Sequence, residues 1–207
     1  MAGIAGIIKY MLNKYNFLVN KFVSKSGHQP EISGVLVTKD GTAATDRYTL
    51  LEVSAPELEL SDYPIIPNNE TAETETHIMP IDAANQLQAN LKKIKGNLPI
   101  LENAASLKLT ESRQAGFITT NLETAAPVIY RKIDGEYPNY KQIMPTGEPV
   151  HTFNVSPDFL KRIAEVYCAI GNASVEVKLY GDNQPMTFEA KTPQGQTVKA
   201  LLMTIKS

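Results

Sequence analysis

One order of secondary-structure elements recurs along this chain of 207 residues. It is clearest near the C-terminus, where Ser156, Pro157 and Asp158 supply an N-cap, a proline at the first helical position and an acid in the first turn. The helix that begins there should bury one apolar face before Gly171 ends it. That face consists of Leu160, Ile163, Tyr167 and Ile170, after an extended segment at 152–155 and before strands expected at 175–180, 186–190 and 198–205.

The same order precedes it in the middle of the chain. Residues 77–80 are short and extended, and Asp82 can cap a helix that Gly96 ends. The apolar face of this helix is formed by Ala84, Leu87, Leu91 and Ile94, and strands are expected at 107–110, 115–120 and 126–133.

The N-terminal copy is ambiguous, because its apolar residues also fit one long helix. The order of the later copies favours a strand at 7–12 and a helix at 14–25 with Asn13 as its N-cap, followed by strands at 34–38 and within 42–53. The chain is therefore predicted to contain three β-α-β-β-β repeats of about seventy residues, in an α+β fold with helices on one face of antiparallel sheets.

Composition and charge narrow the function classes. The content of 43% hydrophobic and 20% charged residues is ordinary for a globular protein. The single cysteine, Cys168, cannot form an internal disulfide, which favours a reducing cytoplasm. The N-terminal run 1–8 lacks a basic start, and lysines at 9, 14 and 21 interrupt any spanning segment, so no membrane role is expected. The net charge of −2 is unevenly placed, with lysines and no acid in 1–30 but acids and no lysine or arginine in 51–76.

A tyrosine-rich segment joins the second and third repeats. Asp134 and Gly135 allow a sharp turn, Pro138 forces its predecessor into an extended conformation, and the apolar side chains of the segment should pack against a surface. Those side chains are Tyr137, Tyr140, Ile143 and Met144.

The sequence of this segment resembles the connector between the second and third domains of the bacterial beta sliding clamp, the DNA polymerase III beta subunit. The resembling residues are Ile-Asp-Gly-Glu-Tyr-Pro-Asn-Tyr-Lys-Gln-Ile-Met-Pro. The stretches Ala44–Leu50, Phe153–Ser156 and Leu202–Lys206 resemble other clamp motifs in the same order. The resemblance implies a DNA-clamp fold, with residues 1–135 similar to the second clamp domain, 136–149 a connector and 150–207 similar to the last half of the third domain. It also implies a cytoplasmic, nucleoid-associated DNA replication protein.

A clamp's helices face duplex DNA, so they should be basic without reading bases. The predicted helices place cations there, although lysines at helix C-termini could instead complement the helix dipole. These expected DNA-facing residues are Lys14, Lys21, Lys25, Lys92, Lys93, Lys95, Lys161 and Arg162.

The resemblance also implies a groove between neighbouring domains that captures a short apolar peptide of a polymerase, clamp loader or other client. Apolar side chains with a few polar groups suit such a pocket, although they would also suit a strand core. The matching positions are Thr45, Leu50, Pro138, Ile143, Asn154, Met203, Thr204 and Ile205. The sequence departs from the clamp motif at 47–49 and 204–205, so client preference is expected to differ.

No catalytic motif or metal-ligand spacing occurs, and no cofactor is expected. The leading hypothesis is thus a non-catalytic, homo-oligomeric processivity factor that tethers a client to DNA. The alternative is a protein-interaction module that keeps the fold and groove but closes no ring. The usual bacterial ring has twelve repeats from two chains, so a chain with three repeats would need four copies to match it.

Overall fold

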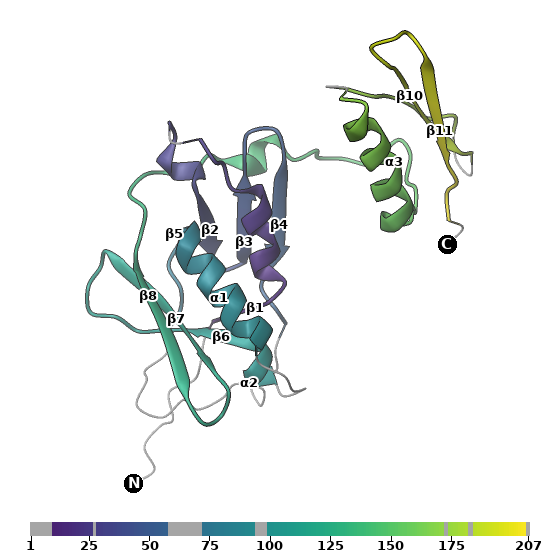
Figure 1. The fold of residues 1–207 in the computed structure, drawn as a ribbon. Helices are drawn as coiled ribbons and strands as arrows, with labels where there is room; N and C mark the ends of the chain where they lie inside the picture. The colour runs from purple at the N-terminus through teal and green to yellow at the C-terminus, as the bar shows by residue number, and fades with distance from the viewer. Residues whose placement is uncertain are drawn as a thin grey trace. The chain divides into compact units, whose positions relative to one another are not determined.

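The computed structural model describes residues 10–26, 28–57, 72–93, 99–171, 174–181 and 184–205. The chain divides into two compact units, Met1–Gln142 and Ile143–Ser207, each of which is described by itself (Figure 1). The boundary between them falls inside the segment expected to be a connector.

Unit 1 (Met1–Gln142) contains two four-stranded antiparallel sheets. The first has the order β4-β3-β2-β5, formed by Leu50–Ser54, Gly41–Thr45, Gly34–Thr38 and His77–Pro80. The second has the order β1-β6-β7-β8, formed by Met11–Asn13, Asn103–Ser106, Gln114–Thr120 and Ala125–Arg131. The helical elements are η1 (Asn16–Phe22), η2 (Pro30–Ile32), α1 (Ile81–Lys93), α2 (Pro99–Glu102) and η4 (Tyr140–Ile143).

The two repeats of unit 1 exchange their first strands. Strand β1, from the first repeat, pairs with β6 of the second, with Leu12 opposite Ala104. Strand β5, from the second repeat, pairs with β2 of the first, with Met79 opposite Val35. Each sheet therefore depends on both repeats, which explains why they form one unit.

The helices of the two repeats lie side by side over the sheets (Figure 1). The side-chain amide of Gln88 donates to the carbonyl of Phe17 at 3.1 Å, and that of Asn20 donates to Asn85 Oδ1 at 3.0 Å. Because residue numbers rise along η1 as they fall along α1, the two helices are antiparallel. The pair of repeats is thus arranged with approximate two-fold symmetry.

Alternating strand residues separate two layers. Val35 and Val37 face the helices and belong to the main core, which both repeats build and which includes Phe17, Leu87 and Phe117. Leu36, between the two valines, lies on the opposite face and packs with Ala43 and Tyr140. The connector side chains Tyr137 and Tyr140 therefore cover the sheet face that is turned away from the helices.

Unit 2 (Ile143–Ser207) consists of one helix on one sheet. Helix α3 (Pro157–Ala169) packs on β11-β10-β9, formed by Thr197–Leu202, Met186–Lys191 and Glu176–Lys178. Only Tyr167, Phe188 and Leu202 of its described apolar cluster are buried. The backbone N–H of Ile205 donates to the carbonyl of Asn154 at 2.7 Å, so the chain end is held against the segment before α3.

Several predicted boundaries are correct, such as 34–38 and 77–80 for strands and Pro157 for the start of a helix. The helix expected at 14–25 is wrong in type and length, because the segment forms the 3-10 helix η1 over Asn16–Phe22. Its predicted N-cap, Asn13, ends β1 and accepts a hydrogen bond from the N–H of Tyr15 at 2.9 Å. The part of the predicted strand at 7–9 lies outside the described residues.

Other boundaries also differ. Asp82 lies within the first turn of α1 rather than before it, and the strand expected at 107–110 is instead β6 at Asn103–Ser106. Strand β11 ends at Leu202, and the predicted helix stop at Gly96 lies outside the described residues. Leu160 was expected to be buried but is 41% exposed, because in the described residues of unit 2 no second repeat covers that side of α3.

Candidate functional site

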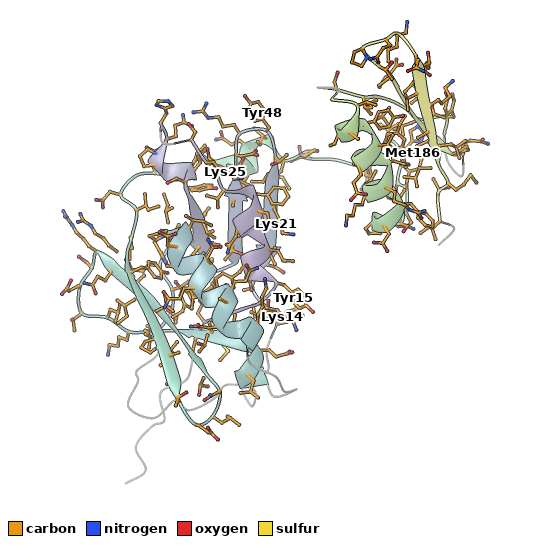
Figure 2. All side chains as sticks on the ribbon, in the orientation of Figure 1. Lys14, Tyr15, Lys21, Lys25, Tyr48 and Met186 are labelled. Atoms are coloured by element: carbon orange, nitrogen blue, oxygen red, sulfur yellow. The ribbon has the colours of Figure 1, made fainter. Side chains whose placement is uncertain are left out.

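Lysines lie on the helix layer of unit 1, as Figure 2 shows for Lys14, Lys21 and Lys25 around η1. Lys21 and Lys25 are exposed, and no ion pair involves either of them among the described residues. Lys14 is partly neutralised, because its Nζ lies 3.4 Å from Glu102 Oε1 and also over the ring of Tyr15. This layer is thus cationic around η1.

The remaining predicted cations divide between the two units. Lys92 is exposed near the end of α1. Lys93 is the last residue of α1, but its side chain and the whole of Lys95 lie outside the described residues. In unit 2, Lys161 Nζ lies 3.8 Å from Glu165, and the guanidinium of Arg162 stacks over the ring of Phe159. Arg162 therefore also covers apolar surface.

The groove positions of unit 1 lie around the connector. The phenol oxygen of Tyr137 accepts a hydrogen bond from the N–H of Thr45 at 3.0 Å, and Tyr140 donates to Glu52 Oε1 at 2.6 Å. Burial raises the pKa of Tyr137 to about 12, and burial together with the Glu52 hydrogen bond raises the pKa of Tyr140. Both phenols stay protonated, so they fix the connector against β3 and β4. Leu50 is half-buried against the same cluster.

The turn that follows Thr45 is tightly built, although its residues depart from the clamp motif. Asp46 accepts hydrogen bonds from the N–H groups of Tyr48 at 3.0 Å and Thr49 at 2.7 Å. The bonds from Thr49 are the main reason why the pKa of Asp46 is lowered. Arg47 adopts a positive φ of 81°, and Tyr48 projects from the tip with 92% of its surface exposed. The turn holds an aromatic side chain in solvent beside Leu50.

A groove of about 600 Å³ runs beside the connector in unit 1. Pro138, Tyr137 and Tyr140 line it together with Leu36 of β2. Cationic and acidic side chains surround this apolar floor, namely Arg113, Lys132, Lys141, Asp134 and Glu136. Of the predicted positions Pro138 lines this groove, while Thr45 bonds to Tyr137 and Leu50 packs in the cluster that contains Tyr140.

The groove positions of unit 2 gather at the chain end. Asn154 bridges to Ile205, and Met203 and Ile205 are 59% and 52% exposed. Met203 also lines a hollow of about 530 Å³ between α3 and β11, together with Phe159, Ile163 and Val166. Phe159 and Val166 were missed from sequence, although their spacing with Ile163 is that of one helix face. Ile143, at the start of this unit, is 77% exposed.

The described residues offer few features that would suit a metal site, a membrane span or catalysis. No cluster of His, Cys, Asp or Glu among the described residues could hold a metal ion. None of the helices in the described ranges is long and apolar enough to cross a membrane. The buried histidine, His77, is bonded on both ring nitrogens, to the carbonyl of Glu75 and to the hydroxyl of Tyr130.

The arrangement of antiparallel sheets with helices on one face is the fold of DNA sliding clamps, as the resemblance implied. More particularly, solved structures of bacterial clamps match this chain. The chain matches the beta sliding clamp of C. crescentus with a TM-score of 0.63 and 14% identity, over 99% of this chain and 52% of that one. The sliding clamp of Bacillus subtilis matches with a TM-score of 0.64 and 16% identity, over 99% and 51%.

The beta subunit of DNA polymerase III from Thermotoga maritima matches with a TM-score of 0.61 and 16% identity, over 99% of this chain and 52% of that one. The chain thus spans about half the length of these clamp chains. No protein-family model matches the sequence, and no curated protein matches it significantly.

Proposed function

We propose that this protein is a sliding-clamp-like processivity factor, which encircles or contacts duplex DNA and tethers a polymerase or another client to it. The clamp fold together with the exposed lysines around η1 carries the proposal. DNA phosphates can be neutralised by Lys14, Lys21, Lys25 and Lys92. A protein that slides along DNA needs no side chains arranged to recognise bases. Its role is non-catalytic, as an accessory subunit that acts in a homo-oligomer.

We further propose that a short apolar client peptide binds the half-buried Leu50 and the exposed Pro138 of unit 1 and the exposed Met203 and Ile205 of unit 2. These side chains are supported from beneath by hydrogen-bonded tyrosines in unit 1 and by the Asn154–Ile205 bridge in unit 2. Methionine adapts its shape to varied ligands, which suits a site that receives several clients. Polymerases, clamp loaders and other proteins with such a motif are the proposed partners.

The second candidate is a protein-interaction module that binds client peptides without encircling DNA. The paired Lys14–Glu102 and Lys161–Glu165 contacts favour it, because they reduce the cationic charge that DNA would meet. The two functions differ in one observable property, since only the first requires binding to duplex DNA.

The DNA proposal can be tested by charge reversal on the helix layer. The double variant Lys21→Glu, Lys25→Glu should weaken nonspecific duplex binding and reduce the slope of log K against log salt by about 2, at roughly 0.9 per phosphate contact. Lys39→Glu with Lys141→Glu is a matched control, because Lys141 lies in η4 on the opposite sheet face and the charge change is the same. Equal losses in both variants, or no loss in the first, would contradict this assignment of the DNA-facing surface.

A further inference from the structure

Unit 2 exposes apolar side chains at the positions where unit 1 buries them. Helices α1 and α3 both have 13 residues, and alignment of their first residues places Ala84 with Leu160 and Leu87 with Ile163. Ala84 and Leu87 are fully buried, whereas Leu160 is 41% exposed and Ile163 is half-buried. The neighbouring repeat makes this difference in burial, because in unit 1 the helix η1 of the first repeat packs beside α1 of the second repeat.

Strand β9 of the unit 2 sheet shows the same difference in burial. Val177 of β9 lies opposite Phe188, so it points to the helix-covered face of the sheet, yet it is 49% exposed. The helix-facing residues of β2, Val35 and Val37, are fully buried. We define the open flank of unit 2 as Leu160, Ala164 and Val177.

The backbone on this side also lacks a contact that unit 1 has. In unit 1 the first strand of the second repeat bonds on one edge to Ile133, whose N–H donates to the carbonyl of Ile78 at 3.0 Å, and on the other edge to β2. In unit 2 the equivalent bond joins the N–H of Ile205 to Asn154. Among the described residues, no strand pairs with the other edge of 152–155 or with the free edge of β9.

We infer that a second copy of this chain covers the open flank, so that two copies of unit 2 form one complete domain of two repeats. Residues 152–155 of each copy would pair with β9 of the other, as β5 pairs with β2. The second copy is the occupant that fits, because the exchange in unit 1 is made by two similar repeats related by an approximate two-fold axis, and unit 2 presents both a donor strand and an acceptor edge.

Charge placement agrees with this symmetric arrangement. Lys161 and Glu165 lie one turn apart on α3, and each directly follows a residue of the open flank in the sequence. When two copies of α3 pack antiparallel, as η1 and α1 do, the lysine of each copy approaches the glutamate of the other. A parallel arrangement would instead bring like charges together.

The register of the two helices follows from unit 1. Leu12 and Met79 occupy the same place in the exchanged strands, since each is fully buried in the shared core. Phe17 is then the counterpart of Ala84, and thus of Leu160. Because Gln88 bonds to Phe17, and Ala164 is aligned with Gln88, Leu160 should lie opposite Ala164 of the second copy.

This inference shares the homo-oligomer with the proposed function, but it rests on repeat pairing and requires neither DNA nor a peptide. Light scattering over a concentration series should give an even multiple of the chain's 22.7 kDa. Ala164→Arg should halve that mass, because the charge would meet Leu160 of the second copy. Ala169→Arg is the matched control on the same helix, at an exposed position away from this stripe, and should leave the mass unchanged.

Thiol cross-linking tests the geometry. The chain has one cysteine, Cys168, which is exposed, and the proposed register places it opposite Ser156 of the second copy. Ser156→Cys should therefore allow a short bismaleimide to form covalent dimers, whereas the natural chain and Ser156→Cys with Cys168→Ser should not. Within one copy these positions are about 18 Å apart, too far for the linker. A monomer at all concentrations, or an assembly that ignores Ala164→Arg and does not cross-link, would overturn the inference.

Discussion

At the scale of single residues, the buried His77 shows how environment sets a protonation state. Its Nδ1 lies 2.7 Å from the carbonyl oxygen of Glu75, which can only accept, so Nδ1 carries the proton. Its Nε2 then accepts from the hydroxyl of Tyr130 at 2.8 Å. Burial is the main reason why the pKa of His77 is lowered from 6.5, and the charge of nearby Lys132 acts in the same direction.

This environment predicts a pH dependence of stability. Below pH 6.5 the unfolded chain protonates His77 while the folded chain still holds it neutral, so stability is present above that pH and is lost as pH falls toward the lowered pKa. Thermal unfolding at about pH 7.5 and about pH 5.5 should show a smaller decrease in Tm for His77→Gln than for the natural protein. The exposed His28 provides the control, and His28→Gln should keep the full decrease. An unchanged decrease in His77→Gln would exclude His77 as its cause.

At the scale of elements, the sequence predicted best where a local signal acts alone. The Ser156-Pro157-Asp158 start located α3 correctly, because a proline at the first helical position and an acid in the first turn are local signals, although the Ser156 side chain makes no capping hydrogen bond. The first helix was misjudged because η1 is held by contacts distant in sequence. The amide of Asn16 donates to the carbonyl of Ser54 at 2.9 Å, and Thr42 Oγ1 donates to the carbonyl of Asn16 at 2.8 Å. Hydrophobic periodicity in the sequence does not reveal that a polar residue such as Asn16 is fully buried.

The anchoring role of Asn16 can be measured. Asn16→Ala leaves the β4 carbonyls of Val53 and Ser54 without their side-chain donor, so it should lower the free energy of unfolding by about 2–4 kcal/mol. Asn20→Ala is the matched control, because it removes one bond near the surface, to Asn85, and should cost less than about 1 kcal/mol. Urea denaturation compares the two. Similar losses would show that η1 does not depend on its buried asparagine.

At the scale of the whole molecule, the number of repeats could be predicted from sequence, but strand exchange could not. The order of elements is local information, whereas β1 and β5 cross between repeats and so pair with residues distant in sequence.

Client binding is the property by which the proposed function can be tested in the whole protein. A short peptide with a glutamine and a Leu-Phe pair should bind in the micromolar range, about −8 kcal/mol, since a flexible linear ligand loses conformational entropy on binding. Removal of apolar contact at either set of positions should weaken it, so Leu50→Ala in unit 1 and Met203→Ala in unit 2 should each reduce affinity by roughly tenfold. Leu122→Ala is the control, because this leucine is 60% exposed in the β7–β8 turn. Calorimetry measures all three variants, with circular dichroism to verify folding. If the folded protein gives no binding heat, or if Leu122→Ala weakens binding as much as the other two changes, the assignment of these residues to the client site is wrong.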